Sequence, residues 1–408
     1  MPEEWQTVPI GDVLVSAQYG LNLPVKPNGT VPIIGMKDMV AGRVENSGWG
    51  CVELPARDHA RYLLQEGDIL LNRTNSPDLV GKVALWTRSE EAVFPSYIVR
   101  FRTNKERVDA AFINYVLNSD DGQTRLKALS TRGVSQANIN PTTFRKAFTL
   151  HLPPAAEQRR IATVLDAWND AIGLAEHVVT LCNARERALR ERSYADTGGV
   201  PTSLEAIFKA AGKVNANAID HVITVGKYAI RPQSEHFGKS VASKNLSNYN
   251  VIEPGQFVYD PMSLYYGAIG RYDDDQTGVV SPVYRVLSLQ DGVISDFVVS
   301  LLKTERLRYE FDAQSSQGNN EGKRRGIDRE VFFQIPVRLP SEEVQLNVAA
   351  VNSAIAMATR AAKSRVDLLR RQKRGLMQKL LTGEWRVPAT GDAFVPGGPV
   401  ADRLEAAE

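Results

Sequence analysis

The sequence predicts an α+β fold with an internal repeat, in which two similar globular units are each followed by one long helix. LPPAAEQRRIATVLDAWNDAI, from Leu152, resembles LPSEEVQLNVAAVNSAIAMAT, from Leu339, at an offset of 187 residues. Self-similarity at a long, fixed offset indicates a duplicated architecture. Within each unit the apolar runs that suit strands follow one another rather than alternating with helices, which favours a curved, mainly antiparallel or mixed sheet.

Further matched segments support the repeat and set its boundaries. Tyr97 and Tyr284 keep the offset of 187 inside FPSYIVRF and SPVYRVLS, while FINYVLNS from Phe112 and FVVSLLKT from Phe297 differ by 185. Small differences in loop length account for the drift. We therefore predict a first globular unit at 1–152, a first helix at 153–197, a second unit at 198–339, a second helix at 340–383, and a loosely ordered tail at 384–408.

Composition is that of an ordinary globular protein from a reducing compartment. The 408 residues are 43% hydrophobic, which suffices for well-buried cores. Cys51 and Cys182 form neither a disulfide framework nor a zinc site by themselves, which favours a cytoplasmic setting. MPEEWQTVPIGDV lacks the pattern of a secretion signal, and no apolar run approaches the length of a membrane span. The formal net charge of +2 leaves the binding partner open.

A polar run directly after a buried strand is a prominent local feature of the first unit. In GDILLNRTNSPDLVGKVALW, residues 67–86, three apolar residues after a glycine turn predict a strand, and residues 72–76 are then all polar. The second unit has a weaker copy, PGQFVYDPMSLYYGAIGRY, at residues 254–272. This copy loses two basic residues and gains two tyrosines.

The two long segments have the pattern of two helices packed on each other. Pro153 and Pro340 stand where a helix starts, and Gly198 and Gly383 stand where it ends. Each helix then runs about 38 to 42 residues, or roughly 60 Å. Apolar residues recur at alternating spacings of three and four, typical of a coiled-coil seam, although a core face inside one domain is the alternative. The predicted seam positions are Ile161, Val164, Trp168, Ala175, Val348, Val351, Ile355 and Ala362.

The sequence contains no complete set of catalytic residues. It has no GxxxxGK[ST] phosphate loop, and its five histidines form no pair at metal-ligand spacing. Asp312, Glu321 and Lys323 have a spacing compatible with a Mg²⁺-dependent nuclease. However, the last two lie in SSQGNNEGKRRG, whose glycines and asparagines predict a mobile loop rather than a rigid strand. We therefore expect no metal, no cofactor and no catalysis.

Two corresponding loops carry side chains that suit contact with DNA. STRGVSQANIN spans 130–140 in the first unit, and SSQGNNEGKRRG spans 315–326 in the second. Arg, Lys, Asn and Gln read base edges, whereas Ser, Thr and Gly let a backbone approach phosphate. The alternative is that each loop is polar only because it is solvated. The occurrence of a similar polar loop at the corresponding place in both copies favours binding. Together with the polar run and its copy, the candidate DNA contacts are Arg73, Asn75, Lys82, Arg132, Gln136, Asn138, Tyr265, Gln317, Asn319, Lys323 and Arg324.

Several segments resemble the DNA specificity subunits of type I restriction-modification systems. They are GDILLNRTNSPDLVGKVAL, the segments at the starts of both long helices, and QKRGLMQKLLTGEWRV at residues 372–387. The resemblance covers almost the whole chain in the correct order, and the last motif is the most specific. It implies two target-recognition domains, related by a pseudo-twofold axis, that read the two halves of a bipartite, nonpalindromic DNA target. It also implies that the two helices pack antiparallel as a spacer of fixed length.

The resemblance implies partners as well. Members of this family bind double-stranded DNA and dock methyltransferase subunits, two being expected, on the outer faces of the helices. Those subunits supply the S-adenosylmethionine site that this chain lacks, and a motor-nuclease subunit joins them for restriction. The differences between the polar run and its copy are then expected, because each domain reads its own half-site. A metal-dependent nuclease and a coiled-coil assembly scaffold without DNA contacts are the alternatives from other classes.

Overall fold

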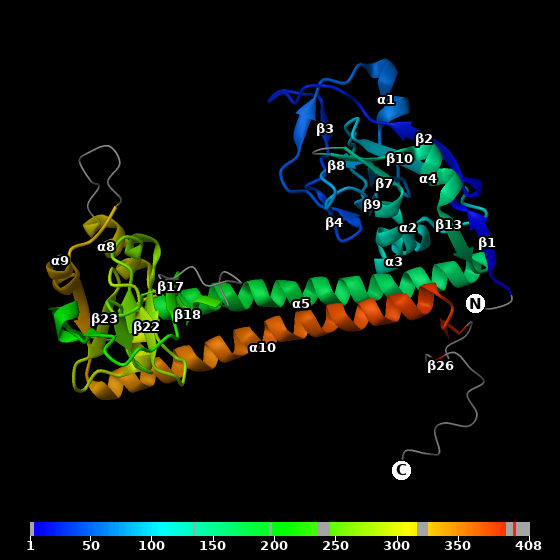
Figure 1. Ribbon diagram of the computed structural model, residues 1–408. Helices are drawn as coiled ribbons and strands as arrows, with labels where there is room; N and C mark the ends of the chain where they lie inside the picture. Colours follow the sequence, from blue (N-terminus) through cyan, green and yellow to red (C-terminus); the bar gives the residue numbers. More distant parts are fainter. Residues whose placement is uncertain are drawn as a thin grey trace, which may run out of the picture. The chain divides into compact units, whose positions relative to one another are not determined.

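The computed structural model describes residues 4–133, 136–195, 198–234, 245–315, 325–388 and 395–396 (Figure 1). The chain divides into two compact units, the first made of residues 1–174 with 366–408 and the second of residues 175–365. Each unit therefore combines one globular part with sections of both long helices. In the described part of the chain, no helix has the length and apolar character needed to cross a membrane.

A six-stranded sheet forms the centre of the first unit. Its order is β2 (Leu14–Tyr19), β10 (Ile98–Thr103), β7 (Ile69–Asn72), β9 (Val83–Leu85), β5 (Arg43–Val44) and β4 (Met39–Val40). Neighbouring strands are antiparallel except β5 and β9, so the sheet is mixed but mainly antiparallel. Around it lie β1 (Gln6–Pro9) paired with β13 (Thr149–Leu152), β3 (Val31–Ile33) paired with β6 (Gly50–Val52), the turn η1 (Ile10–Asp12) and helix α1 (Ala56–Tyr62).

Burial on both faces explains why β7 reads as a continuous apolar run. Ile69 and Leu71 belong to a large core cluster with residues of α2 (Ala110–Asn118), α3 (Asp120–Ala128) and α4 (Pro141–Ala147), while Leu70 belongs to a separate cluster with Trp86. Figure 1 shows α2 and α3 next to the strands of this sheet. Each of the three helices begins at a polar cap, because Asp109, Ser119 and Asn140 accept hydrogen bonds from first-turn N–H groups.

The second unit repeats the order of the central strands. Its four-stranded sheet runs β15 (Phe208–Ala210), β23 (Arg285–Leu289), β20 (Phe257–Tyr259) and β21 (Ile269–Arg271). These strands correspond in chain order and pairing to β2, β10, β7 and β9. The pair β14 (Val200–Ser203) and β24 (Pro336–Leu339) likewise corresponds to β1 and β13. This shared topology agrees with the predicted internal repeat.

Helices and smaller sheets complete the second unit. The helices are α7 (Ser295–Leu301), α8 (Glu305–Gln314) and α9 (Arg329–Gln334), and the short turns are η2 (Leu204–Ala206) and η3 (Leu264–Tyr266). One small sheet contains β16 (Lys213–Val214), β19 (Asn250–Ile252) and β22 (Gly278–Val280), and another contains β17 (Ile223–Gly226) and β18 (Ala229–Pro232). The core again forms between sheet and helices, where Phe257 and Tyr259 of β20 share a cluster with Phe297 and Phe311.

Two long helices follow the two globular parts, as the proline and glycine positions predict. Helix α5 (Ala155–Ala195) has 41 residues and α10 (Glu342–Leu381) has 40, so each is about 60 Å long. Within the first unit, Ile161 and Leu165 of α5 share one core cluster with Leu376 and Leu380 of α10. After α10 the chain forms β25 (Trp385–Arg386), which pairs with β26 (Val395–Pro396).

The predicted seam positions differ in how deeply they are buried. Ile161 is buried, and Val164, Trp168, Ala175, Val348, Ile355 and Ala362 are half-buried. Val351 is instead 49% exposed, and the adjacent Asn352 is buried. The buried stripe of this section of α10 contains Gln345, Ala349, Asn352 and Thr359. It lies one residue beyond the predicted positions and includes polar side chains, which a search for apolar residues alone passes over.

Trp168 packs beside a cavity rather than being enclosed by the second helix. Its side chain is half-buried against the core cluster that includes Leu376. A cavity of about 610 Å³ is lined by Val164, Trp168 and Trp385, together with residues of α10. The tryptophan therefore occupies a helix–helix boundary within the first unit while keeping one side open.

A buried glutamine attaches each long helix to the globular part before it. Gln158 accepts a hydrogen bond from the Asp109 N–H (2.9 Å) and donates to the carbonyl oxygens of Pro153 (2.8 Å) and Arg107 (3.2 Å). Its counterpart is fully analogous. Gln345 accepts from the Ile294 N–H (2.8 Å) and donates to the carbonyl oxygens of Pro340 (3.0 Å) and Gly292 (3.4 Å). The duplication thus extends to individual hydrogen bonds.

Candidate nucleic-acid interface

A small polar sheet joins two segments of the first unit that are far apart in sequence. Strand β8 (Thr74–Asn75) comes from the polar run after β7, and β12 (Ala137–Ile139) comes from the loop at residues 130–140. Asn75 pairs with Ala137 and Thr74 with Asn138, while β11 (Ser130–Arg132) pairs with the other edge of β12. The two predicted DNA-contact segments of this unit therefore belong to one sheet.

The hydrogen bonds of this sheet decide which side chains are free to contact a ligand. Asn138 accepts from the Thr74 hydroxyl through Oδ1 at 3.3 Å, and its main-chain carbonyl accepts from the Thr131 hydroxyl at 3.0 Å. Asn75 donates to Met36 Sδ at 2.8 Å and accepts from the Ser76 N–H at 2.8 Å. Both asparagines therefore brace the sheet. The Nδ2 group of Asn138 remains a donor without a hydrogen bond among the described residues.

The basic residues of the polar run lie at the edge of the same region. The guanidinium of Arg73 stacks over the Tyr19 ring at 5.0 Å, and its main chain bonds Tyr97 and Ile139. Lys82 is half-buried, and its ammonium forms no hydrogen bond or ion pair within the described residues. Arg and Lys side chains in such positions supply positive charge for phosphate or base acceptors.

Gln136, which precedes β12, has an exposed side chain that suits contact with a DNA base. Gln136 is exposed, and its carbonyl accepts from the Gly133 N–H at 2.7 Å. A glutamine amide carries a donor and an acceptor and can pair bidentately with adenine. The side chain of Arg132 lies outside the described part of the structure, although its main chain belongs to β11.

In the second unit, Tyr265 lines a pocket at the corresponding end of the sheet. The half-buried Tyr265 ring meets Tyr266 edge-on at 5.4 Å and lies under the Arg325 guanidinium at 4.9 Å. Arg325 is fixed by an ion pair with Asp312 at 2.8 Å. The pocket has a volume of about 460 Å³ and is lined by Asp260, Met262, Ser263, Tyr265, Ser281, Val283, Tyr284 and Arg325.

Two residues of this pocket, Asp260 and Tyr284, stand at positions that correspond to Asn72 and Tyr97 of the first unit. They are not among the candidate DNA contacts predicted from the sequence, although this correspondence could have identified them. Asp260 follows β20 as Asn72 ends β7, and Tyr284 precedes β23 as Tyr97 precedes β10. Burial raises the pKa of Tyr284, and the negative charge of Asp260 adds to the effect. Burial likewise raises the pKa of Tyr97, with a smaller contribution from the charge of Asp38. Both hydroxyls therefore stay protonated and able to donate hydrogen bonds.

Four candidates of the second unit cannot be placed. Gln317, Asn319, Lys323 and Arg324 lie outside the described residues, as does Glu321 of the nuclease alternative. Asp312 is described, and it is paired with Arg325 rather than grouped with other acidic residues. Across the described ranges there is no cluster of three or more His, Cys, Asp or Glu side chains that could hold a metal ion. No observation favours the nuclease alternative.

Comparison with known proteins points to one family. Residues 2–178 match the model of the type I restriction modification DNA specificity domain. A putative type I restriction enzyme specificity subunit of Methanocaldococcus jannaschii is 26% identical over 197 residues, which are 48% of this chain and 46% of that protein. The matched region thus spans about half the length of this curated relative.

Solved structures share the fold over a greater length. The S subunit of a type I restriction-modification system from M. genitalium superposes with a TM-score of 0.53 at 15% identity, covering 92% of this chain and 96% of that chain. A chain from a study of complex assembly and conformational transition in the type I R-M system gives a TM-score of 0.57 at 14% identity, covering 93% and 98%. At such low identity these matches establish fold. Residues 2–178 are thus similar to the type I restriction modification DNA specificity domain.

Proposed function

We propose that this chain is the noncatalytic DNA-recognition subunit of a type I restriction-modification complex. Residues 1–152 and 198–339 act as two target-recognition domains, each reading one half of a bipartite, nonpalindromic target. The observation that carries the proposal is that the specificity-domain match covers residues 2–178, and that the second unit repeats the central strand order of the first. One chain with two copies of a reading domain suits a target with two separate halves.

Sequence differences at corresponding positions support two different half-sites. Asp260 directly follows β20, the counterpart of β7, where the first unit has Asn72, and Pro261 follows where the first unit has Arg73. A carboxylate accepts from the amino group of cytosine, whereas amide and guanidinium groups suit adenine and guanine. For the first half-site we propose contacts from Arg73, Asn75, Lys82, Arg132, Gln136 and Asn138, and for the second from Tyr265, Gln317, Asn319, Lys323 and Arg324.

The two long helices act as an antiparallel coiled-coil spacer. In the first unit, Arg160 near the start of α5 bonds the carbonyl of Val387, which follows α10, while the later Asn169 accepts from Lys373 within α10. Residue numbers therefore rise along α5 as they fall from Val387 back into α10. In the second unit, Tyr194 of α5 and Val348 of α10 pack against the same core cluster. Both observations fit one antiparallel pairing. A stiff helix of fixed rise would then set the number of unread base pairs.

The proposal assigns chemistry to partner subunits. Two methyltransferase subunits dock on the outer faces of the helices and supply S-adenosylmethionine chemistry, and a motor-nuclease subunit joins for restriction. The relative from Methanocaldococcus jannaschii is named as a specificity subunit of a type I restriction enzyme, which supports this assembly. This chain would contribute DNA binding and position the methyltransferases on the target.

Methylome sequencing tests the proposal directly. Cells that express this chain with the methyltransferase subunits of its system should show one methylated bipartite motif, absent when this chain is omitted. Target affinity of the reconstituted complex should also fall by about 10³-fold or more between 50 and 200 mM salt if six or more phosphates are contacted. A complex that binds all DNA sequences alike, or a methylome unchanged by this chain, would overturn the proposal.

A further inference from the structure

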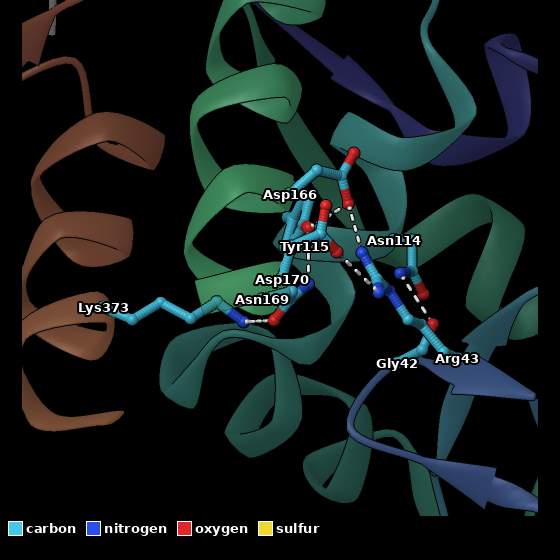
Figure 2. A network of polar contacts seen from close by, with 8 residues as sticks. All are labelled: Gly42, Arg43, Asn114, Tyr115, Asp166, Asn169, Asp170 and Lys373. Atoms are coloured by element: carbon cyan, nitrogen blue, oxygen red, sulfur yellow. Dashed lines mark hydrogen bonds and ion pairs between the residues drawn. The ribbon is translucent and has the colours of Figure 1, made fainter. Parts of the chain in front are cut away.

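We infer that a polar network, the helix clamp, holds the first recognition domain at a fixed angle on the two long helices and thereby enforces the spacing of the DNA target. The clamp consists of Arg43, Tyr115, Asp166, Asn169, Asp170 and Lys373, all within the first unit (Figure 2). The inference rests on the proposed function, and it assigns positioning residues that do not contact DNA.

Arg43 provides the ionic part of the clamp. It lies on the short hairpin of β4 and β5, and its guanidinium contacts Asp166 at 3.0 Å and Asp170 at 3.3 Å, one turn apart on α5. The hairpin itself is braced, because Asn114 of α2 donates to the Gly42 carbonyl at 3.0 Å. Gly42 has φ +83°, a conformation that favours glycine. The hairpin thus presents Arg43 to the helix in a defined position.

Tyr115 links this ion pair to the second helix. Its hydroxyl donates to Asp166 at 2.6 Å and accepts from Asn169 Nδ2 at 2.8 Å. Asn169 in turn accepts from Lys373 Nζ of α10 at 2.5 Å, and that ammonium lies 5.4 Å from the centre of the Tyr115 ring. Figure 2 shows this chain of contacts running from α10 through α5 to the β4–β5 hairpin. Four separate elements are therefore joined by matched donors and acceptors.

The electrostatics favour a network over independent surface pairs. Burial lowers the pKa of Arg43, but the hydrogen bonds to Asp166 and Asp170 outweigh it, so the pKa lies above its ordinary value. Burial lowers the pKa of Lys373, and the nearby positive charge of Arg43 acts in the same direction. The side chains of Arg43 and Asp166 are 42% and 45% exposed, so the ion pair alone is weak and salt-sensitive. The ion pair can hold the domain in place because Tyr115 connects it to Asn169 and, through Asn169, to Lys373 of α10.

The clamp is specific to the first unit. The residues of α10 that correspond to Asp166, Asn169 and Asp170 at the repeat offset are Ser353, Ala356 and Met357, and Ser300 corresponds to Tyr115. None of these carries a charge. The second unit attaches its domain differently, because Tyr194 of α5 donates to the Phe297 carbonyl at 2.7 Å. A core contact of Ile161 and Leu165 anchors the first domain near the start of α5, and the clamp lies just beyond it, where it limits tilting about that anchor.

The consequence concerns spacing rather than base reading. A domain free to tilt reaches half-sites at neighbouring distances, so loss of the clamp should weaken discrimination between the correct spacer and spacers one base pair longer or shorter. The recognised bases should not change, because no clamp residue belongs to the proposed reading surface. Salt should produce the same loss of discrimination in the wild-type complex.

The test uses the complete complex with its methyltransferase subunits and DNA duplexes that carry the target found by methylome sequencing. Affinity is measured for the correct spacer and for spacers changed by one base pair, and the ratio is compared among variants. Arg43→Ala and the milder Tyr115→Phe should each reduce this ratio by about three- to tenfold, while the methylated bases stay the same. Arg88→Ala is the matched control, because Arg88 pairs with Glu90 inside the same domain at 2.5 Å.

Further variants separate positioning from general stability. Arg43→Lys, which keeps the charge, should restore part of the discrimination, and combining Arg43→Ala with Asp166→Asn should add little to either alone. If Arg43→Ala and Tyr115→Phe both keep the wild-type ratio while the wild-type complex binds its target specifically, the clamp inference is wrong and the proposed function stands. A wild-type complex without sequence preference would instead refute the proposed function.

Discussion

Individual side chains of the small polar sheet differ in their freedom to contact DNA. Asn75 and Asn138 are held by Met36 and Thr74, whereas Gln136 is exposed at the hairpin. We therefore expect Gln136→Ala to relax the methylated motif at one position of the first half-site, by about 1 to 3 kcal/mol of discrimination, with no change in the second half-site. Methylome sequencing measures both halves at once.

Lys127→Ala provides the control for this substitution, because Lys127 is exposed on α3 close to the same hairpin in sequence. It should leave the motif intact and at most weaken all sites alike. An unchanged motif in the Gln136 variant, or an equal change in both halves, would assign the hairpin no reading role.

The paired glutamines predict a second residue-level effect. Gln158 is 1% exposed, and Gln158→Leu leaves the Asp109 N–H and the Pro153 carbonyl without their partner. Such unpaired buried groups should lower the free energy of unfolding by about 2 to 3 kcal/mol, and Gln345→Leu should act similarly in the second unit. Denaturant unfolding measures the loss. The exposed Gln372 offers a control, since Gln372→Leu should change stability by less than about 0.5 kcal/mol.

Residue types were easier to predict from sequence than residue neighbours. The polar run at 72–76 and the loop at 130–140 were each recognisable, because turn residues and hydrogen-bonding side chains cluster there. Their union in one sheet depends on the pairing of β8 with β12, between residues 64 apart such as Thr74 and Asn138. Local patterns do not encode such a long-range register. The same limit explains why Asp260 and Tyr284 were missed.

At the scale of elements, the sequence predicted the bounds of the long helices well. It predicted only some of the residues on their buried faces. Prolines and glycines place the ends of α5 and α10 within a few residues. Val351 was assigned to the seam because it is apolar, yet Asn352 is the buried neighbour. An ideal helix drifts relative to a heptad repeat, so the buried face moves to the next residue along a helix of this length.

A bidentate ion pair attaches β25 to the beginning of α5. Arg386 Nε and Nη2 donate to the two carboxylate oxygens of Glu157 at 2.8 and 2.7 Å, and Glu157 is only 2% exposed. Arg386→Leu should destabilise the first unit by about 3 kcal/mol, because it leaves a buried carboxylate without its partner. Thermal unfolding checks this expectation. The double substitution Arg386→Leu with Glu157→Leu should recover most of the loss, and a double variant no more stable than the single one would contradict this reading.

For the whole molecule, the duplicated architecture predicts that a change in helix length alters the distance between the two half-sites without altering the bases that each domain reads. Both domains repeat the central strand order, and both are attached by an equivalent buried glutamine. Changing the helices away from these attachment points should therefore leave each domain's own fold and specificity intact. The boundary between the two compact units cuts α5 after Leu174 and α10 after Arg365, which marks suitable positions for insertion.

Inserting four helix-forming residues at both positions adds about one turn, or about 6 Å, to each helix. At about 3.4 Å per base pair, we expect the unread spacer of the methylated motif to lengthen by about two base pairs, with both half-sites unchanged. The same four residues inserted after the exposed Gly48, which lies in the loop between β5 and β6 of the first domain, should leave the spacer as it is. A spacer that stays constant in the helix variant, while its two half-sites are still methylated, would show that the helices do not set the distance between the bases that are read.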